Sequence, residues 1–160
     1  MLIWFIVVAP ILVAEVFRSP MIDYRLVAFG AALPLVEVFV GANVLHTLLG
    51  SVVAMTVVML ATQKRRIVRR RLLGIPIGMF VHLVLDASWT RAELFWWPGF
   101  GLDFGPDRLP EFDRPLAVGL GLELIGLVAA WWAVRRYDLT DPEKRARLIS
   151  TGQLDRSVLS

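Results

Sequence analysis

Runs of apolar residues separated by short polar stretches divide this chain of 160 residues into five segments. The runs cover residues 1–17, 26–41, 46–62, 72–89 and 115–134. A helix needs about 20 apolar residues to cross a bilayer, because each residue adds about 1.5 Å. The third and fifth runs meet that length, whereas the first, second and fourth are short or interrupted. The pattern predicts an all-α polytopic membrane protein with four to five short transmembrane helices.

Two prolines interrupt these runs. Pro10 lies within the first run and Pro34 within the second. Proline lacks the backbone donor and clashes with the preceding turn, so we expect the second segment to be kinked, broken or re-entrant. The first run has neither a basic start nor a clear small-residue cleavage site, which favours a retained membrane helix over a signal peptide.

Composition agrees with a membrane protein. Hydrophobic residues make up 57% of the chain, and the mean hydropathy is +0.65, which is too apolar for an ordinary soluble domain of this size. The chain has no cysteine, which excludes a disulfide framework and a thiolate metal site.

The distribution of charge predicts the orientation. The basic run 64–71 lies between two apolar runs, which indicates a cytoplasmic loop rather than a nucleic-acid site. A second basic cluster follows residue 134, so we expect a cytoplasmic C-terminus and an exterior loop 90–114. The chain then divides into a membrane domain, 1–137, and a loosely held cytoplasmic polar tail, 138–160. The charge pattern does not decide on which side of the membrane the N-terminus lies.

The stretch "GMFVHLVLDASW", residues 78–89, places two ionisable groups in an apolar helix. His82 and Asp86 are four residues apart and therefore share one helix face. An ionisable group near the bilayer centre costs about 2.5–3.5 kcal/mol, so such groups are usually paired, bound to metal or placed in a cavity. Imidazole nitrogen and carboxylate oxygen suit zinc or a similar divalent ion. A structural His–Asp pair is the alternative.

Other ionisable residues share this depth. Counted from the basic loops at about 1.5 Å per residue, His82 lies roughly 16 Å deep, Asp86 roughly 22 Å and His46 roughly 25 Å, while Glu37 and Glu123 lie about 18 Å deep. We therefore expect all five in the outer half of the membrane. His46, the only other histidine, is the natural third ligand. Glu37 and Glu123 could instead be buried carboxylates bonded to a neighbouring helix.

Several motifs together suggest a family. "DYRLVAFGAALPLVE", "HTLLGS", "GMFVHLVLDASW" and "WPGFG", spread over about residues 22–100, resemble motifs of bacterial inner-membrane proteins described as metal-dependent hydrolases. The resemblance implies that His82, Asp86 and His46 are metal ligands. It also places Glu37 at the second aspartate of a Pro-Asp-x-Asp element, which implies a ligand or catalytic role.

The chain departs from the family pattern at two places. Leu35 stands where the first aspartate is expected, and Gly41, Ala42 or Asn43 replaces an earlier histidine. The resemblance therefore implies a reduced metal site or a loss of catalysis in this chain.

Three functions fit these observations. The first is a metal-dependent hydrolase, with zinc the favoured ion, that acts on a membrane lipid or lipid-linked substrate. The second is a non-catalytic accessory subunit with a protein partner in the membrane or cell envelope. The third is a transporter or proton path, which five short spans without an inverted repeat make the weakest of the three.

Overall fold

The computed structural model describes residues 1–37, 43–102 and 114–159, and every regular element within these ranges is helical. The elements are α1 (Leu2–Phe17), α2 (Tyr24–Glu37), η1 (Val44–His46), α3 (Leu48–Ala61), α4 (Arg66–Leu72), α5 (Gly74–Leu85), η2 (Ser88–Thr90), α6 (Ala92–Phe95), α8 (Leu116–Arg136), α9 (Pro142–Thr151) and η3 (Arg156–Val158). The predicted all-α class is confirmed.

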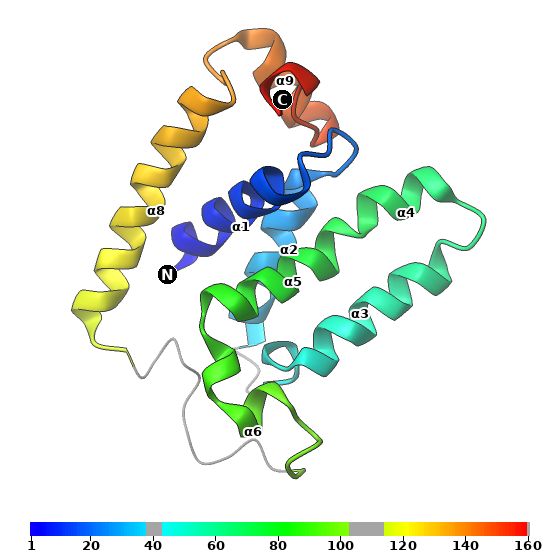
Figure 1. The fold of residues 1–160 in the computed structure, drawn as a ribbon, viewed down its shortest axis with the longest axis vertical. Helices are drawn as coiled ribbons and strands as arrows, with labels where there is room; N and C mark the ends of the chain where they lie inside the picture. The colour runs from blue at the N-terminus through cyan, green and yellow to red at the C-terminus, as the bar shows by residue number, and fades with distance from the viewer. Residues whose placement is uncertain (38–42, 103–113, 160) are drawn as a thin grey trace.

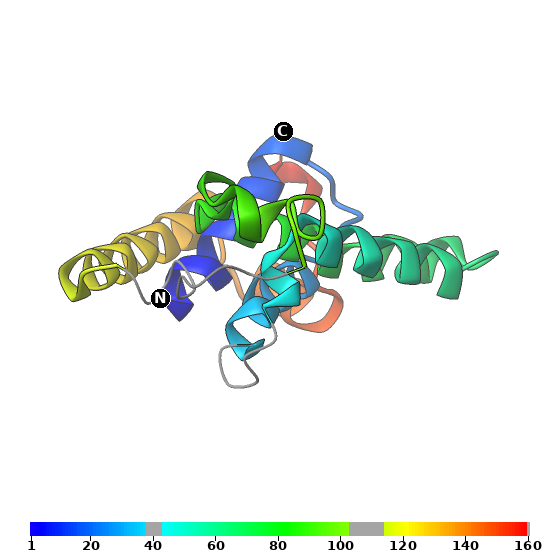
Figure 2. The same cartoon turned by 90° about the horizontal axis from the view of Figure 1, so that it is seen from below.

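Helices α1, α2 and α5 form the centre of the bundle, and α8 and α3 lie at opposite edges (Figures 1 and 2). The crossing of α2 and α5 depends on two glycines. A Cβ at Gly78 would lie 2.1 Å from the carbonyl oxygen of Val27, and a Cβ at Gly30 would lie 2.1 Å from that of Ile75. Glycine is therefore needed at both positions, because any larger residue would separate the two backbones.

One helix in the described ranges is long and apolar enough to cross a membrane. This is α8, with 21 residues and a hydropathy of 1.8, and only 6% of its most apolar stretch is buried inside the molecule. Such exposure is unlike the core helix of a soluble protein. Helices α1 and α3 are apolar but shorter.

Neither proline ends its helix. Pro10 lies inside α1, and Pro34 lies inside α2, which continues to Glu37. The predicted break at Pro34 is therefore wrong. Pro34 is buried, and α2 packs along both α1 and α5, so tertiary packing holds the helix through the missing hydrogen bond. The remainder of the second apolar run, 38–41, lies outside the described residues.

The fourth apolar run and its basic neighbour also differ from the prediction. Most of the basic run forms helix α4 rather than a loop, since arginine is a good helix former and its long side chains reach water there. Helix α5 then ends at Leu85, with Asp86 at its C-cap, rather than continuing to residue 89. Residues 103–113 of the predicted exterior loop 90–114 lie outside the described residues.

The C-terminal segment is packed rather than loosely held. Leu154, Val158 and Leu159 are buried in the same core cluster as Phe5 and Ala9 of α1. The backbone N–H of Tyr24 also donates to the carbonyl oxygen of Gly152 at 2.7 Å. Apolar residues near the end of the polar tail account for this docking.

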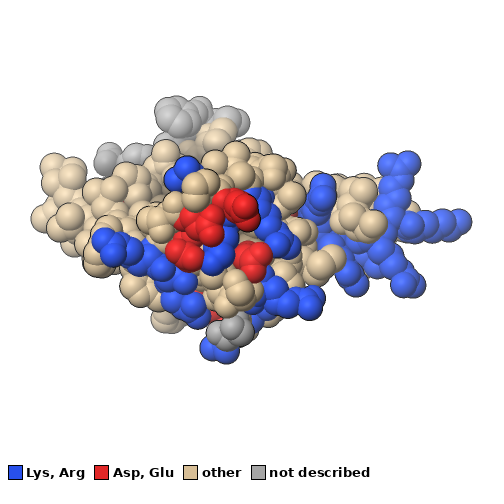
Figure 3. All heavy atoms as spheres, turned by 90° about the horizontal axis from the view of Figure 1, so that it is seen from above, with Lys and Arg blue, Asp and Glu red and all other residues tan. Residues whose placement is uncertain are grey.

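The basic segments share one end of the molecule. The α1–α2 connection and α9 lie at the upper end in Figure 1, and the α3–α4 turn lies at the right-hand edge of the same upper half. Figure 3, which views that end, shows many Lys and Arg side chains with a smaller group of Asp and Glu among them. We refer to these segments as the charged end.

Candidate functional site

The predicted site residues come from the opposite end of the bundle. Glu37 is the last residue of α2, His46 the last of η1, and His82 lies in the last turn of α5, followed by Asp86 at its C-cap. His46, His82 and Asp86 have no exposed surface, and Glu37 is 7% exposed. The rings of His46 and His82 have centroids 5.4 Å apart. We refer to these four residues as the buried polar cluster.

Glu37 orients the η1 turn and its histidine. Oε2 of Glu37 accepts the backbone N–H of Leu45 at 2.7 Å and lies 3.3 Å from Nδ1 of His46. The hydroxyl of Thr47 then caps α3 by accepting the N–H of Gly50 at 2.9 Å. A carboxylate oxygen accepts hydrogen bonds, so Nδ1 of His46 is the donor in this contact.

His82 is held in the same manner by the backbone of α2. Its Nδ1 lies 2.7 Å from the carbonyl oxygen of Ala31, and the ring of Phe5 stacks on the imidazole with a centroid distance of 4.0 Å. A carbonyl oxygen can only accept, so Nδ1 of His82 carries a proton and is the donor in this contact. Histidines that bind metals are usually anchored in this way.

Asp86 is in contact with residues that the sequence did not suggest. Its Oδ2 accepts the hydroxyl of Ser88 at 2.9 Å, and its Oδ1 lies 3.1 Å from Nη1 of Arg114. Nη2 of Arg114 also donates to the backbone oxygen of Asp86. The position of Arg114 directly before an apolar run was the only available signal, because the pairing depends on where the chain before α8 returns to the end of α5.

The predicted three-ligand site is not assembled in this arrangement. Within residues 1–37, 43–102 and 114–159, no three His, Cys, Asp or Glu side chains are grouped as a metal site would require. The two imidazoles are suitable nitrogen donors, whereas Glu37 faces the protonated nitrogen of His46 and Asp86 is engaged by Arg114. Metal binding stays a prediction.

Glu123 lies apart from this cluster and caps another helix. Its Oε2 accepts the backbone N–H groups of Ile3 at 3.0 Å and Trp4 at 3.3 Å, and its Oε1 lies 3.0 Å from the amine of Met1. These are the otherwise unsatisfied donors at the start of α1. The alternative that Glu123 bonds to a neighbouring helix is confirmed.

Comparisons with family models, with curated proteins and with solved structures give no match to this chain. The family resemblance therefore rests on the motifs themselves. Of the positions at which the chain departs from that family, Gly41 and Ala42 lie outside the described residues, and Asn43 has a left-handed φ of 58° at the start of η1.

Proposed function

We propose that this chain is a multi-pass protein of the bacterial inner membrane and a metal-dependent hydrolase of a lipid or lipid-linked substrate. His46, His82 and Asp86 bind the divalent ion, zinc being favoured, and Glu37 lies beside them. The observation that carries the proposal is the pair of fully buried imidazoles, each with Nδ1 held by an oxygen acceptor. Metal-binding histidines usually donate their other ring N–H to such an acceptor, which fixes the ring for coordination.

Each residue has a distinct role in this proposal. The imidazoles supply neutral nitrogen ligands, and the carboxylate of Asp86 supplies the negative oxygen, positioned by Ser88 and Arg114. Glu37 fixes the tautomer of His46 and is the candidate proton acceptor during hydrolysis. When bound, a divalent ion would polarise the scissile group of the substrate as a Lewis acid.

Metal content tests the proposal directly. Protein purified in detergent without chelator should contain close to one equivalent of zinc or another divalent metal per chain. His46→Ala and His82→Ala should each remove it, while Glu123→Gln, a change of a partly exposed carboxylate outside the cluster, should not. Wild-type protein that is folded and metal-free under these conditions would contradict the proposal.

Asp86→Asn separates two roles for the aspartate. A direct ligand should lose the metal as fully as His82→Ala does, because an amide oxygen is a poor zinc ligand. A residue that only positions a ligand should weaken metal affinity by about 10- to 100-fold. Near-complete metal content in Asp86→Asn at micromolar free zinc would remove Asp86 from the ligand set.

The membrane topology is tested separately. The apolar surface of α8 and the gathering of basic segments at one end support a multi-pass arrangement with the charged end in the cytoplasm. Since the chain has no cysteine, a single cysteine at Arg69 or Arg147 reports the side of each segment. Neither should react with an impermeant maleimide in intact cells. A cysteine at Arg69 that reacts as readily as one at Trp96 would contradict this topology.

A second function is supported by the contacts of Asp86. The alternative that we propose is a non-catalytic accessory subunit with a protein partner in the membrane, and the ion pair with Arg114 supports it because it gives Asp86 a purely structural partner. In that case His82→Ala should lower thermal stability without any change in metal content.

A further inference from the structure

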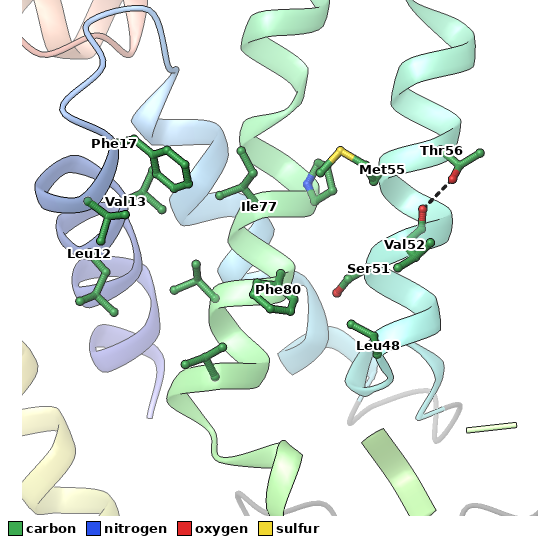
Figure 4. A pocket seen from close by; sticks show the side chains of 14 residues that line it. Leu12, Val13, Phe17, Leu48, Ser51, Val52, Met55, Thr56, Ile77 and Phe80 are labelled. Carbon is green, nitrogen blue, oxygen red and sulfur yellow. Dashed lines mark hydrogen bonds between the residues drawn. The ribbon is translucent and has the colours of Figure 1, made fainter. Parts of the chain in front are cut away.

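An apolar pocket lies beside the buried polar cluster. Helix α5 forms its floor, and α1 and α3 form its two walls (Figure 4). The cavity has a volume of about 530 Å³, which lies within the roughly 300–1,000 Å³ of small-molecule sites. Its walls are aliphatic and aromatic, and they include Phe17, Val52, Met55 and Phe80.

One polar side chain in this lining has an unmet hydrogen-bonding capacity. Ser51 is 4% exposed, and its hydroxyl makes no hydrogen bond to any described residue. The other hydroxyl of the lining, on Thr56, already donates to the carbonyl oxygen of Val52 at 2.8 Å. Figure 4 shows the oxygen of Ser51 directed from α3 toward α5, into the pocket. A buried hydroxyl without a partner costs about 1–3 kcal/mol, so a ligand oxygen at this position would be stabilising.

The pocket adjoins the two histidines through the chain itself. Leu48 and Ser51 lie in the first turns of α3, which begins two residues after His46, and Val81 directly precedes His82. Ser51 therefore lies at the end of the pocket that is nearest the cluster. The opposite end is lined by Phe17 at the end of α1 (Figure 4).

We infer that this pocket binds an acyl chain of a membrane lipid, with Ser51 donating to an oxygen of the lipid's ester linkage. The inference names the substrate class of the proposed hydrolase and rests on that function for its membrane setting. An apolar pocket with one unpaired hydroxyl, on the side beside the cluster, matches a molecule with a hydrocarbon tail and a single polar junction.

The character of the walls favours a lipid over a partner helix. Helices that associate within membranes meet through small residues such as Gly, Ala and Ser, which allow close backbone approach. Here the rims of the pocket carry bulky residues that are half or more exposed, namely Val16 at 72%, Phe17 at 59% and Val52 at 51%. Between such residues a flexible chain fits and a helix backbone does not.

Photo-crosslinking tests the inference with the intact protein. The wild type would be reconstituted in phosphatidylcholine vesicles containing a diazirine on one acyl chain, in chelator, and labelled peptides would be mapped. Labelling of the α3 and α5 residues in the pocket should exceed that of exposed positions on α8, such as Leu124, by at least severalfold. Equal labelling of both surfaces would overturn the inference, because it would mean only general lipid contact.

Two matched variants sharpen the test. Val52→Trp should fill the pocket and reduce its labelling severalfold, whereas Val53→Trp should not, because Val53 is equally exposed at 50% but does not line the pocket. Ser51→Ala should weaken retention of the lipid about three- to tenfold by removal of one hydrogen bond. Equal effects of the two tryptophans would also overturn the inference.

Because occupancy is measured in chelator, it does not depend on the metal. A labelled pocket in a protein that purifies metal-free without chelator would support lipid binding and contradict the hydrolase, whereas an unlabelled pocket in a protein that purifies with zinc would do the reverse.

Discussion

The two ends of this bundle both contain ion pairs, and the pairs with the shorter distances should contribute less to the stability of the fold. At the charged end, Lys144 lies 2.6 Å from Asp138 and Arg147 lies 2.7 Å from Asp155, with side chains 26–52% exposed. In the buried polar cluster, Arg114 lies 3.1 Å from Asp86, which has no exposed surface. Water and ions screen an exposed pair, so burial rather than distance decides what each pair contributes.

The two kinds of ion pair also differ in whether water can replace a lost partner. The exposed pairs can be exchanged for water at little cost, and they mark the end of the molecule that we place in the cytoplasm. A buried carboxylate has no such exchange, so its partners must stay in place for the fold to persist. Ser88 and Arg114 therefore help to hold the buried polar cluster in place, although neither is a candidate ligand.

The largest expected effect comes from removing one partner of the buried pair. Asp86→Ala should destabilise the protein by about 3–5 kcal/mol, because it leaves the guanidinium of Arg114 without its carboxylate. Asp155→Ala, at the charged end, should leave thermal unfolding in detergent within error of the wild type. The double variant Asp86→Ala with Arg114→Ala should recover part of the loss. Equal losses of stability for Asp86→Ala and Asp155→Ala would contradict the conclusion that burial decides what each pair contributes.

The next effect concerns the helix crossing that supports the cluster. Gly78→Ala should destabilise by about 1–3 kcal/mol, because its Cβ would meet the backbone of α2 and force α5 outward. Gly121→Ala is the matched control, since no atom lies within 4 Å of its Cβ position on α8, and it should be neutral or slightly stabilising. Circular dichroism on heating would measure both. Equal behaviour of the two variants would mean that the α2–α5 contact is not as close as described.

A carboxylate of intermediate exposure should give an intermediate effect. Glu123, 27% exposed, caps the start of α1, so Glu123→Ala should cost about 0.5–2 kcal/mol, and Glu123→Gln less because an acceptor oxygen remains. Hydrogen exchange of the Ile3 and Trp4 amides should accelerate in Glu123→Ala and not in Asp155→Ala. Unchanged exchange would show that the cap contributes nothing.

The smallest effect should appear on acidification of the charged end. Hydrogen bonds from the backbone N–H and the hydroxyl of Ser157 lower the pKa of Asp155 below its ordinary value of 3.8. A lowered pKa in the folded state means that the contribution is present above pH 3.8 and is lost as the pH falls through the folded value. The C-terminal segment should therefore stay packed at pH 5 and loosen only below about pH 4. Hydrogen exchange of the Ser157 amide would measure this. Loosening already at pH 5 would contradict this assignment.

Several features could be predicted from the sequence because they depend on local pattern. Long apolar runs specify helices whatever their neighbours, and α1, α3 and α8 follow these runs closely. The sequence also placed His46 and His82 in the same half of the membrane, and in the structure their rings are neighbours. Their burial follows from the apolar residues that flank them.

Other features were inaccessible because they depend on contacts between distant segments. The continuation of α2 through Pro34 requires packing on α1 and α5 to compensate for a lost hydrogen bond. The docking of Leu154 and Leu159 requires a core surface that no local pattern in the tail reveals.

The sequence by itself determined the helical class, the apolar surface of α8 and the residue types available to the cluster, because these follow from side-chain chemistry and spacing along one chain. Only the tertiary structure decided what each ionisable group contacts. Glu37 contacts His46, Asp86 contacts Arg114, and Glu123 contacts the start of α1. Partners of this kind are set by the angles and depths at which helices cross, and those depend on all the side chains between them at once.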